Sequence, residues 1–334
     1  MAERILAARQ SAPVAQQRFV ESVRANVARV VIGQDEVVER MLIALLTGGH
    51  LLLQGVPGLA KTLLVSAMAR AIDLRFGRVQ FTIDLLPADI VGSEVLDQQS
   101  GKFHINRGPV FTNLLLADEI NRAAPTVQSA LLEAMQERRV TIGNETLSLP
   151  APFLVIATQN PVEQAGTFEL PEAQLDRFMM CHRLDYPTRE EEISIIDQSL
   201  SLGLNRQEHG AVPQTAFDLI RNEDATSVEE LVHAMEQVKQ VHVSPVFSEH
   251  VVELVRRTRE HPMVELGGSP RACIALVTTA QARAFLFDRG HVIPDDLFAL
   301  AEDVLLHRMR VTYEALAEGL TSRHVLGEIL DSMA

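Results

Sequence analysis

A glycine-containing turn followed by lysine and threonine is the first group of residues in this chain that could do chemistry. It reads Gly55-Val56-Pro57-Gly58-Leu59-Ala60-Lys61-Thr62, and Leu63 continues it into an apolar periodic segment. Backbone amides of such a turn and the positive end of the following helix bind phosphate oxygens. Lys61 would reach the outer phosphates of a nucleotide, and the Thr62 hydroxyl would ligate Mg²⁺. The turn therefore predicts a nucleoside triphosphate site.

Ala60 stands where the strict phosphate-loop pattern has its second glycine. A glycine is needed there only if the backbone takes a positive φ or approaches another group closely. We expect the alanine methyl group to be tolerated. An ordinary strand-to-helix turn with a solvated lysine is the alternative interpretation.

Two adjacent acids, Asp118 and Glu119, follow the apolar run 114–117. A fully apolar strand is buried, and its carboxyl end is where ligands bind in open α/β sheets. We expect Asp118 to hold Mg²⁺ and Glu119 to polarise the water that attacks the γ-phosphate. Strands also end in acids that cap helices, which is the alternative.

Asn160 follows another apolar segment, 153–158, and comes directly before Pro161. At the carboxyl edge of the sheet, its amide could orient the attacking water or sense the γ-phosphate. An Asx turn before the proline is its alternative role.

Two arginines are further candidates. Arg177 lies near the end of a short helix expected over 170–178, where it suits the helix dipole and could also act as an arginine finger in a neighbouring copy. Arg271 follows Ser269-Pro270, a good helix start, where the dipole disfavours a cation. We therefore expect an anion beside Arg271, either a nucleotide phosphate or a surface glutamate.

The elements that must position these residues alternate between strands and helices, which is typical of an α/β fold with a parallel sheet. Residues 1–28 are expected to form an N-terminal amphipathic helix, with Val20, Val23 and Val27 on one face. The nucleotide-binding domain is predicted over 29–186, and a separate all-helical domain over 187–334. The five expected strands are the segments 51–54, 78–82, 114–119, 153–158 and 179–184.

Two insertions interrupt this pattern. The segment 84–113 is too rich in apolar and turn-forming residues for a simple connection, and we expect a helix flanked by extended pieces. The segment 138–150 alternates on both sides of Gly143-Asn144, which is typical of a β-hairpin. Upstream of the phosphate turn, Gln34 could line an adenine pocket or belong to a plain loop.

Composition narrows the function classes. The 334 residues carry a formal net charge of −14 and contain no block of Lys and Arg. Binding to nucleic acid is not expected, because it depends on phosphate neutralisation. The two cysteines, Cys181 and Cys273, have no metal-ligand spacing and are interpreted as reduced thiols. With neither a signal-peptide pattern nor an apolar run of membrane length, we expect a cytoplasmic protein without stable membrane insertion.

Taken together, the motifs resemble the MoxR family of AAA+ ATPases over nearly the whole chain from about Val31. The resemblance implies a P-loop NTPase αβα core with a five-stranded parallel sheet and a C-terminal all-α lid, with ATP and Mg²⁺ bound. It is carried by GVPGLAKT (55–62), LLADEINR (115–122), SALLEAMQE (129–137), ATQNP (157–161), LPEAQLDRF (170–178) and SPRA (269–272).

The resemblance also implies a role for each candidate. Residues 55–62 would be Walker A and Asp118 and Glu119 Walker B, while Asn160 would be sensor 1, Arg177 an arginine finger and Arg271 sensor 2. The insertions 84–113 and 138–150 would be the helix-2 insert and the pre-sensor-1 hairpin.

Members of this family resemble chaperone-like remodelers that act on protein clients. They usually form hexameric rings, and they often have partners with von Willebrand factor A domains. The resemblance therefore implies ATP hydrolysis in a homo-oligomeric ring. Two alternatives stay open at the sequence level. One is a motor related to magnesium chelatase or to helicases, and the other is a scaffold that binds ATP with little turnover.

Overall fold

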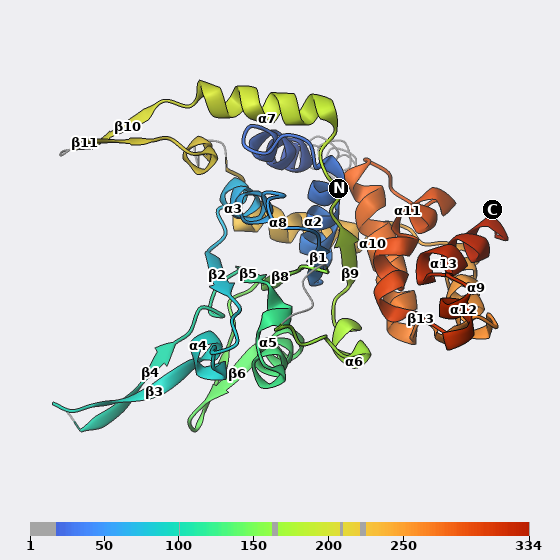
Figure 1. Cartoon of the computed structure of the whole chain (residues 1–334), viewed down its shortest axis with the longest axis horizontal. Coiled ribbons are helices and arrows are strands. Elements are labelled where there is room, and N and C mark those ends of the chain that lie inside the picture. The colour runs from blue at the N-terminus through green and yellow to red at the C-terminus, as the bar shows by residue number, and fades with distance from the viewer. Residues whose placement is uncertain (1–17, 100, 162–165, 208–209, 221–224, 334) are drawn as a thin grey trace, which may run out of the picture.

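The computed structural model (Figure 1) describes residues 18–99, 101–161, 166–207, 210–220 and 225–333. The first part of the predicted N-terminal helix therefore lies outside the described residues. Residues 18–28 are helical, and Val20, Val23 and Val27 are buried as expected. No helix among the described residues combines the length and the apolar character that a membrane span requires.

Five parallel strands form the central sheet, and the predicted sheet is thereby confirmed. Their order is β2-β5-β8-β1-β9. The second strand was predicted two residues too late, because its start is fixed by pairing of Phe76 with Leu114 and its end by pairing of Gln80 with Asp118. The strands are β1 (Leu51–Gln54), β2 (Phe76–Gln80), β5 (Leu114–Asp118), β8 (Leu154–Gln159) and β9 (Met180–Arg183).

Helices cover both faces of this sheet, and its central strands β1, β5 and β8 are apolar on both sides. Leu51 and Leu53 belong to one hydrophobic cluster and Leu52 to the other, as the alternation of side chains along a strand requires. One face packs against α2 (Asp35–Thr47) and α3 (Lys61–Ala71), and α8 (Val228–Val238) packs on α2. The opposite face packs against α5 (Pro125–Glu137).

The first insertion differs from its prediction. A short helix, α4 (Pro87–Val91), leads directly into a hairpin of β3 (Gly92–Asp97) and β4 (Lys102–Arg107) rather than standing between extended pieces. The two chain segments meet closely at the base, where a Cβ on Gly92 would lie 2.3 Å from the Asn106 carbonyl oxygen. Gly92 also has a φ of 104°, so glycine is required where the helix turns into the hairpin.

The second insertion is the predicted hairpin. It consists of β6 (Arg139–Ile142) and β7 (Glu145–Ser148), with Gly143 in its turn at a φ of 57°. The two hairpins project from the same side of the body (Figure 1), and the Glu94 carboxylate of β3 lies against the β6–β7 turn. The insertions therefore form one protruding unit.

The region after residue 186 is mainly helical, as predicted, but it is not all-helical. Its two small sheets pair β10 with β11 and β12 with β13. They were missed because strands of two to four residues carry too little alternation to be recognised. The elements not yet given are α6 (Glu172–Leu175), α7 (Arg189–Ser201), β10 (Leu204–Gln207), β11 (Gly210–Pro213), α9 (Pro245–Glu260), β12 (Val264–Leu266), α10 (Pro270–Leu286), α11 (Pro294–Leu305), β13 (Arg310–Val311), α12 (Tyr313–Ala317) and α13 (Ser322–Asp331), with three short 3₁₀ turns at Ile120–Arg122, Ala216–Leu219 and Leu306–Arg308.

This C-terminal region shares its hydrophobic core with the sheet body. Leu42 of α2, Leu231 of α8 and Leu276 of α10 are all fully buried in the same cluster. The helices of the predicted domain over 187–334 therefore pack against the sheet body through a continuous apolar contact. The change of periodicity after residue 186 marks a change of secondary structure and not the edge of a core.

Buried charges reinforce the joint between body and helices. Arg40 of α2 donates to Asp303 of α11 through Nε and to Glu39 at 2.6 Å, and the His182 Nδ1 of β9 lies 2.9 Å from Asp303 Oδ1. The side chains of Arg40 and His182 are 5% and 9% exposed. We call Arg40, Glu39, His182 and Asp303 the buried network.

Candidate nucleotide-binding site

The predicted phosphate turn joins β1 to α3 at the carboxyl edge of the sheet. Ala60 caps α3 with φ 52° and ψ 25°, so this position does require the left-handed conformation that glycine adopts without cost. Alanine holds it at a cost of about 1 kcal/mol. Gly58 is also left-handed, with a φ of 92°, and a Cβ there would meet no atom within 4 Å. The turn thus has the curvature of a phosphate loop and open space on its outer side.

Lys61 folds back over this turn. Its Nζ donates to the Gly55 carbonyl at 2.7 Å. Partial burial lowers the pKa of the Lys61 ammonium, while Asp118 and Glu119 oppose that shift. The lysine therefore lies between the turn and the two acids, as a phosphate-binding lysine must.

The acid pair comes from β5, two strands away from β1 in the sheet. Asp118 Oδ1 accepts from Thr158 Oγ1 at 2.7 Å, and its Oδ2 pairs with Arg78 at 2.7 Å. The same threonine hydroxyl accepts from the Glu119 backbone N–H at 2.8 Å. Thr158 thus fixes the two acids relative to each other.

Glu119 stands in a strained conformation, with φ 58° and ψ 51°. Its carboxylate accepts from Gln80 Nε2 at 2.8 Å and pairs with Arg122 at 3.0 Å. A left-handed backbone at a non-glycine residue persists only where its surroundings hold it, and such strain concentrates at functional sites. The helix-cap alternative for Glu119 is not favoured, because its side chain caps no backbone N–H of the following turn.

Asn160 lies where the sequence placed it. It follows β8, the strand between β5 and β1, and its side chain is buried. Gln34 caps α2 in a left-handed conformation and donates to the Asp185 carbonyl at 3.3 Å. Gln34 is therefore near the chain that leaves β9 at the same edge of the sheet.

Arg177 and Arg271 lie at the other edge. Both line a cavity of about 270 Å³ together with Gly48, Gly49 and His50, which precede β1. β1 is four residues long, so this cavity is separated from the phosphate turn by roughly 13 Å along the strand. The structure therefore brings the two arginines together and does not bring them to Lys61.

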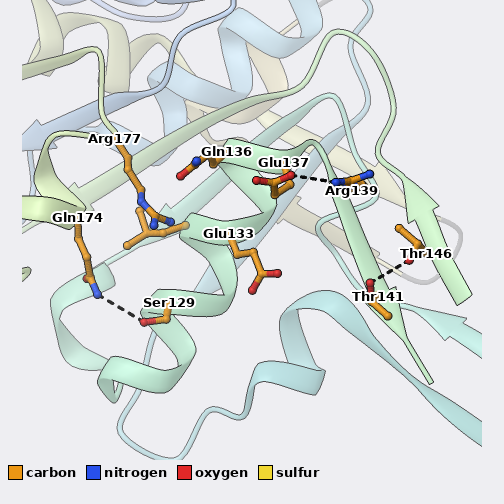
Figure 2. A pocket seen from close by; sticks show the side chains of 10 residues that line it. Ser129, Glu133, Gln136, Glu137, Arg139, Thr141, Thr146, Gln174 and Arg177 are labelled. Carbon is orange, nitrogen blue, oxygen red and sulfur yellow. Dashed lines mark hydrogen bonds and ion pairs between the residues drawn. The ribbon is translucent and has the colours of Figure 1, made fainter. Parts of the chain in front are cut away.

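The expected helix over 170–178 is shorter than predicted, and Arg177 lies beyond its end. The helix α6 spans Glu172–Leu175, with Asp176 as its C-cap. Arg177 borders a second cavity of about 700 Å³, together with Glu133 and Glu137 of α5 (Figure 2). Arg177 is thus presented on an open, polar face of the molecule.

The anion expected beside Arg271 is a residue of the chain itself. Ser269 caps α10 and Pro270 is its first residue, as predicted, and the Arg271 guanidinium lies 3.7 Å from the Asp176 carboxylate. In this structure Asp176 takes the place for which we expected a phosphate or a surface glutamate. Its proximity could not be read from the sequence, because 95 positions separate the two residues.

Several partners of the candidate residues were missed at the sequence level. Arg78 and Gln80 of β2 contact the acid pair because β2 lies next to β5, and their alternating polar positions at a strand end were the available signal. Cys181 and Cys273, interpreted above as reduced thiols, are not paired in a disulfide. Both are free thiols, and burial raises the pKa of Cys181 to about 12.

Comparison with known proteins agrees with this geometry. Residues 50–180 match the model of the ATPase family associated with various cellular activities (AAA), and residues 256–329 match the AAA lid domain. The phosphate turn, the acid pair on the five-stranded sheet and the helical lid therefore define an AAA ATPase.

Proteins that are similar over almost the whole chain show which family of AAA ATPases this is. Chaperone MoxR1 of Mycobacterium tuberculosis is 43% identical over 92% of this chain and 80% of its own length. YeaC of Bacillus subtilis is 42% identical over 92% of both chains. A crystal structure of a protein from Cytophaga hutchinsonii superposes with a TM-score of 0.86 at 40% identity, covering 98% of this chain and 97% of that one. The chain belongs to the MoxR family of AAA ATPases.

Proposed function

We propose that this chain hydrolyses ATP to ADP and phosphate at sites shared between adjoining copies of a ring, and that hydrolysis remodels a protein client. One observation carries the proposal: the phosphate turn and the acid pair lie at one edge of the sheet, and Arg177 and Arg271 at the other. An arginine that acts on the outer phosphate must therefore come from another copy. A closed head-to-tail ring supplies such a copy at every site.

The residues at the phosphate edge fit Mg²⁺ and a triphosphate. Thr62 and Asp118 would hold the metal ion, since hydroxyl and carboxylate oxygens are the ligands it prefers, and it would screen phosphate charge when bound. Gly58 and Ala60 take left-handed conformations, as in a turn whose backbone amides would bind phosphate oxygens, and Lys61 supplies the compensating cation.

Hydrolysis then depends on residues that are already positioned. Glu119 would accept a proton from the attacking water, and Gln80 and Arg122 hold its carboxylate in place until then. Asn160 would orient this water. Arg177 and Arg271 of the adjoining copy would stabilise the charge that develops on the phosphate, which is where most of the rate enhancement in phosphoryl transfer originates.

The proposed client is a protein, and the family resemblance makes a protein with a von Willebrand factor A domain the first candidate. The relative described as a chaperone supports this. So does the hairpin β3–β4, where Leu96 and Phe103 face each other across the strands and are 48% and 64% exposed. Exposed apolar pairs at the end of a projecting hairpin suit transient contact with an unfolded or partly folded segment.

The hydrolytic assignment is tested with Glu119→Gln. We expect ATP binding to be retained and hydrolysis to fall on the order of 100-fold or more, because the proton acceptor is lost while the phosphate turn is untouched. Phosphate release and binding of a fluorescent ATP analogue are measured side by side. Glu229→Gln, an exposed acid on α8, is the control and should behave as the unmodified protein. Persistent turnover in Glu119→Gln would exclude this residue as the base.

The shared site is tested by mixing two inactive variants. Arg177→Ala copies keep the phosphate turn, and Lys61→Ala copies keep the arginine finger, so each alone should be inactive. Mixed rings contain interfaces at which both residues are intact, and we expect part of the ATPase activity to return. Absence of any recovery, although the mixed copies co-assemble in size-exclusion chromatography, would count against a site built from two copies.

A further inference from the structure

Asp176, which precedes Arg177 in the chain, lies where the sheet body contacts the lid. Its carboxylate accepts from Arg308 Nε at 2.7 Å and from Ser269 Oγ at 3.2 Å. The Arg271 Nη1 lies 3.7 Å from its second oxygen. One carboxylate thus contacts two arginines and the cap of α10.

The two arginines are held very differently. The Arg308 side chain is 3% exposed and also donates to the carbonyls of Phe178 at 2.7 Å and Met179 at 3.2 Å. The Arg271 side chain is 56% exposed, and its separation from Asp176 is longer than a charge-assisted hydrogen bond. Arg308 is therefore a fixed partner of Asp176, and Arg271 is an exchangeable one.

Arg308 also donates hydrogen bonds to the backbone on both sides of Arg177. It donates to the Asp176 carbonyl at 3.4 Å in addition to the Phe178 carbonyl, and His307 contacts the Phe178 carbonyl at 3.2 Å. The position of the Arg177 backbone is thus set by the 3₁₀ turn that contains His307 and Arg308.

The cavity beside this cluster is strongly cationic. Among the described residues, Arg138, Arg177, Arg271 and Arg308 all line it, and Asp176 is the single acid in its lining. Burial lowers the pKa of His50 in its wall to about 4, so the imidazole adds no charge at neutral pH. An anion supplied from outside is the electrostatic complement of such a surface.

We propose that Asp176 is a positioning residue for Arg271, which acts with Arg177 on the adjoining copy. It holds the Arg271 guanidinium beside Arg177 while no phosphate is near. When the neighbouring copy binds its nucleotide, Arg271 leaves Asp176 and pairs with the outer phosphate. Arg308 stays paired with Asp176 throughout, so the release of Arg271 leaves the half-buried Asp176 carboxylate with a cation. The proposal rests on the shared ATPase site proposed above.

The test uses Asp176→Asn, which keeps the shape of the side chain and removes its charge. We expect the ATPase kcat to fall on the order of 10- to 100-fold, since a misplaced group costs this much, with the affinity for a fluorescent ATP analogue unchanged. Glu172→Gln is the matched control, since Glu172 begins the short helix that Asp176 caps and pairs with the exposed Arg310. It should hydrolyse ATP as the unmodified protein does.

Mixtures decide on which side of the interface Asp176 acts. Asp176→Asn copies mixed with Lys61→Ala copies should recover activity, because the defect lies on the arginine side. Mixed with Arg177→Ala copies they should stay slow. If the Arg177→Ala and Lys61→Ala mixture recovers and the Asp176→Asn and Lys61→Ala mixture does not, the positioning role is wrong while the shared site stands. Failure of both mixtures points instead to failure of the shared site.

A double variant tests whether Asp176 works through Arg271. Asp176→Asn combined with Arg271→Ala should be no slower than Arg271→Ala alone, whereas a general loss of structure would multiply the two effects. Multiplied losses of kcat in the double variant would overturn the proposal.

If Asp176→Asn does not fold, Asp176→Glu keeps a charge for Arg308 and is used in the same mixtures. It should lose about threefold or more in kcat and recover with Lys61→Ala, and unchanged kcat would overturn the proposal.

Discussion

Two ionic clusters join the sheet body to the C-terminal helices, and they differ in burial and in geometry. In the buried network, Asp303 is enclosed between Arg40 and His182, whose side chains are at most 9% exposed. In the cluster around Asp176, one arginine is equally buried but the other is 56% exposed at 3.7 Å. The first cluster has every charge fixed, and the second has a single cation that can leave.

This difference in burial indicates which charged side chains can change partners. Removing a charge from a buried, hydrogen-bonded pair leaves its partner without solvation, so such a cluster holds one arrangement. An exposed pair contributes little to stability and exchanges partners readily. The lid should therefore move with its own sheet body as one unit, and only the Arg271 side chain and the contacts between copies should respond to the nucleotide.

The largest effect is expected for Asp303→Asn. The substitution leaves Arg40 and His182 without their shared carboxylate, and we expect the free energy of unfolding to fall by about 3 kcal/mol. Urea denaturation followed by circular dichroism measures this. The neighbouring Glu302 forms an exposed pair with Arg323 at 2.9 Å and offers a matched control on the same helix. Glu302→Gln should change the free energy by less than about 1 kcal/mol. Equal effects of the two substitutions would remove the distinction between the clusters.

The smallest effect on stability is expected for Arg271→Ala. Its long, solvent-screened contact with Asp176 should contribute less than about 1 kcal/mol to folding, because Arg308 continues to neutralise the carboxylate. Its effect on ATP hydrolysis should nevertheless be large, since this arginine would act on the phosphate of the adjoining copy. Denaturation and ATPase measurements on the same preparation separate the two. A loss of stability comparable to that of Asp303→Asn would show that both clusters are structural.

The order of the sheet strands was predictable because β1, β5 and β8 are apolar runs and the helices between them have their own periodicity. The candidate residues at the phosphate edge were predictable for the same reason: parallel strands end at one edge, so Lys61, Asp118 and Asn160 had to meet. The Gly143-Asn144 hairpin was predictable from its turn residues. These inferences use only neighbours in the chain and the period of the element.

What could not be predicted depends on contacts between distant segments. Asp176 and Arg308 lie 132 positions apart and meet only because the lid packs beside α6. The left-handed backbone of Glu119 is imposed by its surroundings, since glutamate has no preference for it. The first insertion was misread because its helix and its hairpin are joined at Gly92, whose role appears only from the close approach of Asn106.

The common hydrophobic core has a consequence for how this chain can be divided. The helix α2 packs against α8 and α10, which come after residue 186, and its Leu42 and Leu45 are buried in the core that they share. A fragment ending there would expose this apolar surface to water, and a lid transplanted from another ATPase would have to reproduce its shape. The lid is therefore not an interchangeable module, and recombination between related chains would succeed only where α2 and its covering helices are inherited together.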